Sequence, residues 1–384
     1  MQMAFVHGSE TSLDPQAEFT AGVAAMFAGQ YDNAIAVFSE LYRKTHSPRV
    51  KLEWARAAFL AKNYDVSRQL FSEVLLENPP DIVRFNISLY LGEIAKLGNS
   101  TDYGFSYVRD TNPFAFSKPQ TVTIYGMPFT YRPPRTQETL HGVNAYITHS
   151  RTLNTAGTVR AMVEAEDTEY SGQNNNKSSL KLSLDIKPSL ENNWSIKTGF
   201  DAYLQRRALL LYQPFVGLGY RKDQMGGLIH QLQIDLRHGE NIYPDFSSIN
   251  GTFNSISIQA SKNLNPELQI GGSYYMDATT SASASSAYKT QAQGLFAKFF
   301  TPAIRSNTKI SYTNSKRHYS GVDELFLVKR KDERTILSLA IQPYSLKFAE
   351  LYPSIEFGHE VTDSSIPING YQRNFISLQL KRNY

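Results

Sequence analysis

Cysteine is absent from the 384-residue sequence, and several other functional signals are scarce. Without cysteine the chain forms no disulfide framework, cysteine-ligated zinc site, iron–sulfur cluster or catalytic thiol. No apolar run approaches the roughly 18 residues that a membrane-spanning helix needs. The formal net charge is only +4, from 39 Lys and Arg against 35 Asp and Glu. A field this weak does not point to nucleic acid, so no nucleic-acid partner is expected.

Signals of catalysis are scarce as well. The eight His residues are scattered, and none forms a spaced ligand pair with another His. His238 and Glu240 flank a Gly at the end of a predicted strand, where a solvated loop is the simpler interpretation than an active site. The sequence contains no Gly-rich phosphate loop and no nucleophile elbow. The sequence therefore predicts no enzyme, no metal site and no cofactor.

Residues 15–98 follow a helical period and contain an internal repeat. Residues 24–34 followed by Phe38 recur as residues 57–67 followed by Phe71. The tetratricopeptide helix pair typically has small residues before a Tyr and a Phe seven residues after it. The small residues let the two helices approach, and the aromatic rings fill the space between them. The sequence predicts about two and a half such repeats, preceded by a tail or signal remnant at residues 1–14.

The repeats also predict a groove on the inner face of their superhelix. Most aromatic residues at this spacing pack in a core, and the remainder face the groove, which in such proteins usually holds a peptide segment. The predicted client-binding residues are Phe19, Val23, Met26, Phe27, Arg49, Arg56, Phe59 and Leu60.

From about residue 99 the period changes to two. Residues 180–186 alternate Leu or Ile with Lys, Ser and Asp, and residues 194–203 do much the same. Fourteen such segments can be counted. Short turns and mostly longer polar loops alternate between them, and residues 314–333 form one of the predicted long loops. The pattern predicts a 14-stranded antiparallel transmembrane β-barrel over residues 99–384. A soluble β-sandwich also alternates, but its two apolar faces have to pair with each other.

The last predicted strand ends on an aromatic residue. Ile376, Leu378 and Leu380 share one face of an extended chain that finishes at Tyr384. Such a strand resembles the signal that the bacterial barrel assembly machinery reads, and it closes a barrel against the first strand. Because a sandwich does not need this ending, the terminal strand favours the membrane barrel.

Read in order, these features resemble one family. Residues 68–96 carry a Pro-Pro pair at a helical domain junction, and residues 110–112, 121–129 and 365–374 follow in the barrel half. This α + β two-domain order resembles the surface lipoprotein assembly modulators (Slam), outer-membrane proteins with a periplasmic tetratricopeptide domain and a C-terminal barrel. Two residues depart from the family pattern: Tyr384 stands where Phe is more usual, and Arg382 lies near the expected lipid face.

The resemblance implies a translocator in the outer membrane of a Gram-negative bacterium. Such a protein delivers a lipoprotein, or a related secreted protein, to the cell surface in a type XI-like secretion route. The implied partners are the exported client, the outer-membrane lipid bilayer and the barrel assembly machinery, with no cofactor. A client strand is expected to pair at the seam between the first and last strands.

A second functional class stays open at this point. Some systems that export polysaccharide also join tetratricopeptide repeats to a barrel, so an outer-membrane exporter or porin for polysaccharide or small solutes is the alternative. Residues 1–8 lack the basic start and apolar core of a secretion signal. Either the signal was removed or misannotated, or the protein is cytoplasmic.

Overall fold

The protein consists of two compact units, a helical unit that ends at Leu97 and a β unit that begins at Gly98. The computed structural model describes residues 14–133, 138–154, 157–172, 176–226, 228–343, 346, 348 and 351–382. In these residues no helix is both long enough and apolar enough to cross a membrane.

The helical unit contains five helices in the described residues. They are α1 (Pro15–Phe27), α2 (Tyr31–Thr45), α3 (Pro48–Leu60), α4 (Tyr64–Leu76) and α5 (Asp81–Leu97). Proline occupies the first turn of α1 and of α3, where its missing N–H costs no helical hydrogen bond. The side chain of Asp14 caps α1 by accepting a hydrogen bond from the Gln16 N–H at 3.2 Å. Helix α1 packs on α2 and α3 packs on α4, an arrangement consistent with the predicted repeats.

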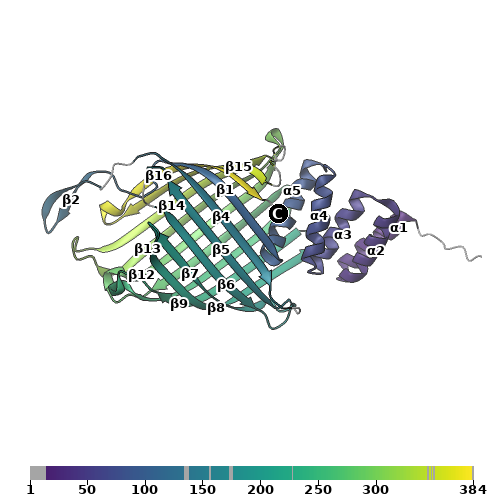
Figure 1. The fold of residues 1–384 in the computed structure, drawn as a ribbon, viewed down its shortest axis with the longest axis horizontal. Coiled ribbons are helices and arrows are strands. Elements are labelled where there is room, and N and C mark those ends of the chain that lie inside the picture. Colours follow the sequence, from purple (N-terminus) through teal and green to yellow (C-terminus); the bar gives the residue numbers. More distant parts are fainter. Residues whose placement is uncertain are drawn as a thin grey trace, which may run out of the picture. The chain divides into compact units, whose positions relative to one another are not determined.

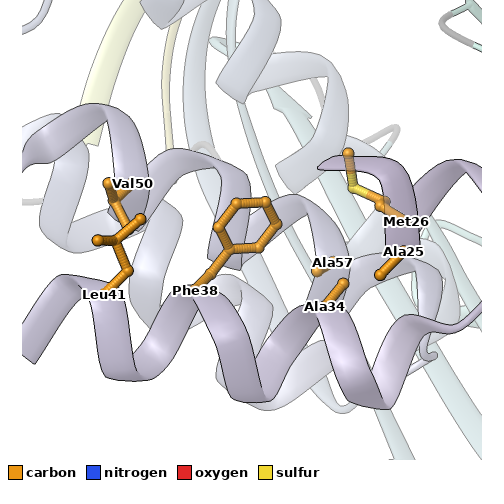
Figure 2. Packing of buried hydrophobic residues seen from close by; sticks show 7 residues of the cluster. All are labelled: Ala25, Met26, Ala34, Phe38, Leu41, Val50 and Ala57. Atoms are coloured by element: carbon orange, nitrogen blue, oxygen red, sulfur yellow. The ribbon is translucent and has the colours of Figure 1, made fainter. Parts of the chain in front are cut away.

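The repeat residues form the core of this unit. Figure 2 shows Phe38 from α2 among the small side chains of Ala25, Ala34 and Ala57, and all four are buried. Gly22 lets the ring come close, because a Cβ at that position would lie 2.8 Å from Phe38. In the next repeat Phe71 is fully buried too. The predicted alternation of small residues and aromatics therefore packs these helices together.

The β unit is a closed barrel (Figure 1). Fourteen strands form its wall, each antiparallel to its neighbours, and β1 closes on β16. They are β1 (Ser100–Asp110), β4 (Leu140–Thr152), β5 (Val159–Tyr170), β6 (Lys177–Ile186), β7 (Trp194–Gln205), β8 (Ala208–Gly226), β9 (Leu228–Asn241), β10 (Gly251–Asn265), β11 (Leu268–Thr279), β12 (Tyr288–Thr301), β13 (Ser306–Val322), β14 (Lys329–Pro343), β15 (Leu351–Ser364) and β16 (Tyr371–Arg382). The predicted strand number and the predicted antiparallel barrel are confirmed.

The two faces of the wall differ in chemistry, as the alternation requires. Large apolar side chains such as Phe105, Ile147 and Leu295 are exposed on the outer face, where they form an apolar band. The positions between them face the lumen and carry polar and charged groups, for example the ion pair of Lys181 with Glu164 at 3.1 Å. Apolar residues outside and polar residues inside are the arrangement of outer-membrane barrels.

The two rims of the barrel carry different connections. We call the rim at which β1 begins and β16 ends the near rim, and the opposite one the far rim. The longest connection, residues 111–139, lies at the far rim, which also has the two-residue turn at Arg206 and Arg207. Within residues 111–139, β2 (Gln120–Ile124) and β3 (Met127–Tyr131) form a separate hairpin outside the barrel wall (Figure 1).

The structure corrects the predicted loop at residues 314–333. Strand β13 continues to Val322 and β14 begins at Lys329, with Arg317 opposite Asp332 in the ladder, so the connection shrinks to residues 323–328. Both faces of these strand ends are polar. The sequence therefore loses its apolar alternation there, although the backbone pairing continues.

Candidate functional site at the barrel seam

The seam between β1 and β16 is the shortest ladder of the barrel in the described residues. Its register runs through seven residue pairs, from Gly104 opposite Lys381 to Asp110 opposite Phe375. On its other side β1 pairs with β4 along its whole length, from Ser100 to Asp110. A short ladder has fewer backbone hydrogen bonds to hold two strands together than a long one.

The far end of the seam is tied by contacts beyond the ladder. The Arg373 guanidinium lies 3.2 Å from a carboxylate oxygen of Asp110. Just past the strand, the Asn112 side-chain amide donates to the Gln372 carbonyl at 3.2 Å. The backbone N–H of Thr111 donates to the Asn374 carbonyl at 3.0 Å, which extends the pairing by one more bond. These contacts join β1 to β16 at the far rim.

The carboxylate of Glu360 organises this end of the seam. Its side chain is only 1% exposed, and it receives Arg334 from β14 at 2.7 Å and Arg373 from β16 at 2.8 Å. The Tyr371 hydroxyl donates to the same carboxylate at 2.6 Å. Because Arg373 also reaches Asp110, a chain of charged groups runs across four strands and the seam. Buried charges joined in this way hold the strands together, since removal of one leaves another unpaired.

Toward the near rim the side chains of Ser106 and Gln379 bond along their own side of the seam, and one cation–ring contact crosses it. Ser106 on β1 donates to the Asn144 side chain on β4 at 3.5 Å. Gln379 on β16 donates to Glu356 on β15 at 3.1 Å. The Arg382 guanidinium lies 5.8 Å from the Tyr103 ring centroid, a contact on the outer face. The near half of the seam thus relies mainly on its backbone ladder, in contrast to the far half.

The predicted terminal-strand residues lie on the outer face of β16. Ile376 is opposite Arg109, Leu378 is opposite Tyr107 and Leu380 is opposite Phe105. Leu378 is 51% exposed, as a side chain that faces lipid would be. Tyr384 lies outside the described residues.

The predicted groove residues of the helical unit have mixed positions. Met26 and Phe59 are buried in the core, at 6% and 5% exposure, so they fill the space between helices. Phe19 packs edge-on against Phe38 with ring centroids 5.8 Å apart, and Arg49 covers its other side at 4.8 Å. The remaining four are placed as follows: Val23 and Leu60 are partly buried beside the core, Arg56 pairs with Glu53 at 2.8 Å, and Phe27 is 73% exposed. Of the predicted groove residues, Arg49 and Phe27 are exposed.

One buried cation stabilises the packing of the helical unit. Lys51 is 6% exposed and contacts Glu77 at 2.7 Å and Glu73 at 3.3 Å, with its ammonium 4.9 Å from the Tyr42 ring centroid. Burial by itself lowers the pKa of Lys51, but the hydrogen bonds to Glu77, Tyr42 and Glu73 outweigh it and raise the pKa above its usual value.

Sequence reasoning missed the Glu360 network. Asp110 and Arg373 fall in stretches that resemble the family, but their spacing of more than 260 residues gave no reason to pair them. The available signal was one charged residue on the lumenal face near the far end of each of the two strands that close the barrel. Across the described residues, no group of three or more His, Asp and Glu side chains is arranged to hold a metal ion.

Comparison with known proteins identifies the β unit. A family model described as surface lipoprotein assembly modifier matches residues 174–384. No curated protein matches the sequence.

Solved structures that are similar to the chain include three outer-membrane proteins. A loop-deletion mutant of the outer-membrane protein OmpT of Vibrio cholerae has 10% identity and a TM-score of 0.37, covering 74% of this chain and 99% of that one. An anion-selective porin from Comamonas acidovorans has 8% identity and a TM-score of 0.39, covering 74% and 100%. A BenF-like porin from Pseudomonas fluorescens has 7% identity and a TM-score of 0.40, covering 74% and 99%. Likeness at this level carries no argument about function.

Proposed function

The chain belongs to the surface lipoprotein assembly modifier family of outer-membrane translocators, and we propose that it delivers a lipoprotein, or a related secreted protein, to the cell surface. The closed barrel and the family match support a location in the outer membrane. In this proposal the near rim and the helical unit face the periplasm and the far rim faces outward, because bacterial barrels have their longer loops outside. The barrel assembly machinery would insert the barrel by reading β16.

The observation that carries this proposal is the unequal strength of the seam. Seven residue pairs hold β1 to β16, and the side-chain contacts across them gather at the far end around Asp110 and Arg373. A wall tied at one end and held mainly by backbone bonds at the other can open from the loose end. Opening exposes unpaired N–H and C=O groups on β1 and β16, and these are a template for an extended segment of a client.

The helical unit would hold the client before it reaches the seam. Phe27 and Arg49 offer one exposed aromatic ring and one exposed cation, which suit a segment with apolar and acidic side chains. The periplasm supplies no ATP, so free energy for transport has to come from client pairing and folding.

A disulfide across the seam tests the route, and the natural absence of cysteine makes the test clean. Ser106 lies opposite Gln379 across the seam and opposite Asn144 in the next ladder. We expect the oxidised S106C/Q379C protein to stop displaying client on intact cells and to recover on reduction. The matched S106C/N144C protein ties the same strand to β4 and should stay active in both states.

Each outcome of this test has a distinct meaning. If the locked seam displays client as well as the control does, transport does not need the seam, and the lateral route is wrong. If neither protein displays client although both barrels are inserted, the exporter or porin alternative becomes the better account. Heat-dependent migration on denaturing gels checks insertion in every case.

A further inference from the structure

The far ends of β12, β13 and β14 extend well beyond the apolar band of the barrel. On the outer face of these strands the apolar band reaches Leu295, Tyr312 and Leu337, all exposed. Beyond them every outward position up to the sixth residue along each strand is polar or charged. Six residues of tilted strand rise about 15 Å. These strand ends thus stand at the level of lipid headgroups and not of acyl chains.

Three basic residues lie in one row at this level. Lys289 on β12 is directly opposite His318 on β13, and His318 is directly opposite Lys331 on β14. All three are exposed and share the outer face with the apolar residues below them. Lys316 and Lys329 flank the row on the same face. The two lysines flank His318 and place positive charge on both sides of one outer-face position, an arrangement that suits an anion.

The acidic residues of this face do not neutralise the row. Glu333 contacts Lys316 at 3.4 Å, and Asp363 on β15 lies opposite Glu333, next to it and away from β12. Across the described residues, no ion pair involves Lys289, His318 or Lys331. Five cations that face the lumen contrast with these, because each has an acidic partner within reach. The lumenal pairs are Lys181 with Glu164, Lys197 with Asp235, Arg237 with Asp201, Arg330 with Asp332 and Arg334 with Glu360.

Aromatic and cationic side chains on the lumenal face stabilise the strand ends that carry the row. Tyr288 and Tyr319 lie opposite each other on the lumenal face with ring centroids 5.6 Å apart. Arg317 lies 4.3 Å from the Tyr288 ring centroid, and Arg330 lies 4.9 Å from that of Tyr319. Cations over aromatic rings hold neighbouring strands in place. The three basic residues therefore lie on paired strands and not on a loop.

We propose that Lys289, His318 and Lys331 bind the phosphate groups of an anionic glycolipid headgroup in the outer leaflet. Ammonium and imidazolium groups bind phosphate by charge and hydrogen bonding, and long Lys side chains can extend along the wall toward the headgroup. Basic groups at a membrane surface recognise anionic lipids in the same manner. The site lies apart from the seam; it rests on the outward orientation proposed for the far rim, and not on the proposed transport route.

Binding of lipopolysaccharide to the purified full-length protein in detergent tests the proposal. We expect the affinity of K289Q/K331Q for lipopolysaccharide to be about thirtyfold lower. Each basic residue near an anionic surface raises the affinity roughly fivefold, and the variant lacks two of them. The control K222Q/K262Q removes two lysines that face outward near the opposite rim and should bind like the unaltered protein. K289R/K331R preserves both charges and should retain binding, which separates lost charge from a damaged fold.

Two further binding measurements distinguish the phosphate of a glycolipid from free inorganic phosphate. Dephosphorylated lipid A should bind as weakly to the unaltered protein as phosphorylated lipid A binds to K289Q/K331Q. Inorganic phosphate should not displace the glycolipid at low millimolar concentration, and displacement there would assign the row to soluble phosphate and overturn the lipid proposal. Equal glycolipid binding by K289Q/K331Q and the control would overturn it as well.

Discussion

Replacement of Arg373 by Gln probes the tie at the far end of the seam. The change removes a guanidinium that is 24% exposed and contacts Glu360 at 2.8 Å and Asp110 at 3.2 Å, two carboxylates that are 1% and 2% exposed. Breaking a buried ion pair by removal of one partner costs about 3–5 kcal/mol. Arg334 still neutralises Glu360, so the main loss falls on Asp110, and we expect about 3 kcal/mol of lost stability.

The assay is urea unfolding of the full chain in lipid vesicles, followed by tryptophan fluorescence. The sequence has two Trp residues, Trp54 in the helical unit and Trp194 on β7, so a Trp54→Phe background lets Trp194 report on the barrel alone. Lys181→Gln is the matched control. It breaks a lumenal pair whose side chains are 41% and 34% exposed, and a pair so exposed contributes less than about 1 kcal/mol. Equal losses in Arg373→Gln and Lys181→Gln would refute the idea that the network ties the seam.

Three further predictions concern packing within the helical unit and packing within the barrel. Phe38→Ala empties a fully buried site and should destabilise the helical unit by about 3–5 kcal/mol in urea unfolding followed by circular dichroism, whereas Phe27→Ala at a 73% exposed site should have little effect. Because the folded pKa of Lys51 lies above its usual value, its stabilisation is complete below about pH 10.4 and is lost as pH rises further. The unfolding free-energy difference between unaltered protein and Lys51→Met should therefore stay constant from neutral pH to about 10 and shrink above it; a difference that shrinks already near neutral pH would contradict the assignment. Gly358→Ala places a Cβ 2.0 Å from the Phe375 ring and should slow barrel folding, and added Phe375→Ala should restore much of the rate if the clash is the cause.

The sequence was most informative where one physical pattern extends over many residues. The alternation from Leu180 to Ile186 repeats in strand after strand, because every strand has lipid on one side and lumen on the other. The spacing of Phe38 and Phe71 predicted helix pairs for a similar reason, since both rings fill equivalent gaps in successive repeats. Patterns of this kind depend on local period and need no knowledge of distant contacts.

The features that were missed depend on distant residues or on loss of the pattern. Asp110 and Arg373 meet only because the barrel closes, and nothing local to either residue reveals the other. The extended ends of β13 and β14 carry polar residues on both faces, and such a sequence predicts a loop. The hairpin of β2 and β3 lies within the connection between β1 and β4 and is not part of the barrel wall. The core positions of Met26 and Phe59 follow from helix packing, which the repeat pattern alone does not specify.

The central claim is that this protein moves a client to the cell surface, and a display assay tests it most directly. The chain, supplied with a secretion signal, would be expressed in a Gram-negative host together with each secreted protein or lipoprotein encoded beside it, and protease added to intact cells. We expect one neighbour to become accessible to the protease only when this protein is present. Accessibility that does not depend on a correctly inserted barrel, or no accessible neighbour at all, would contradict the claim.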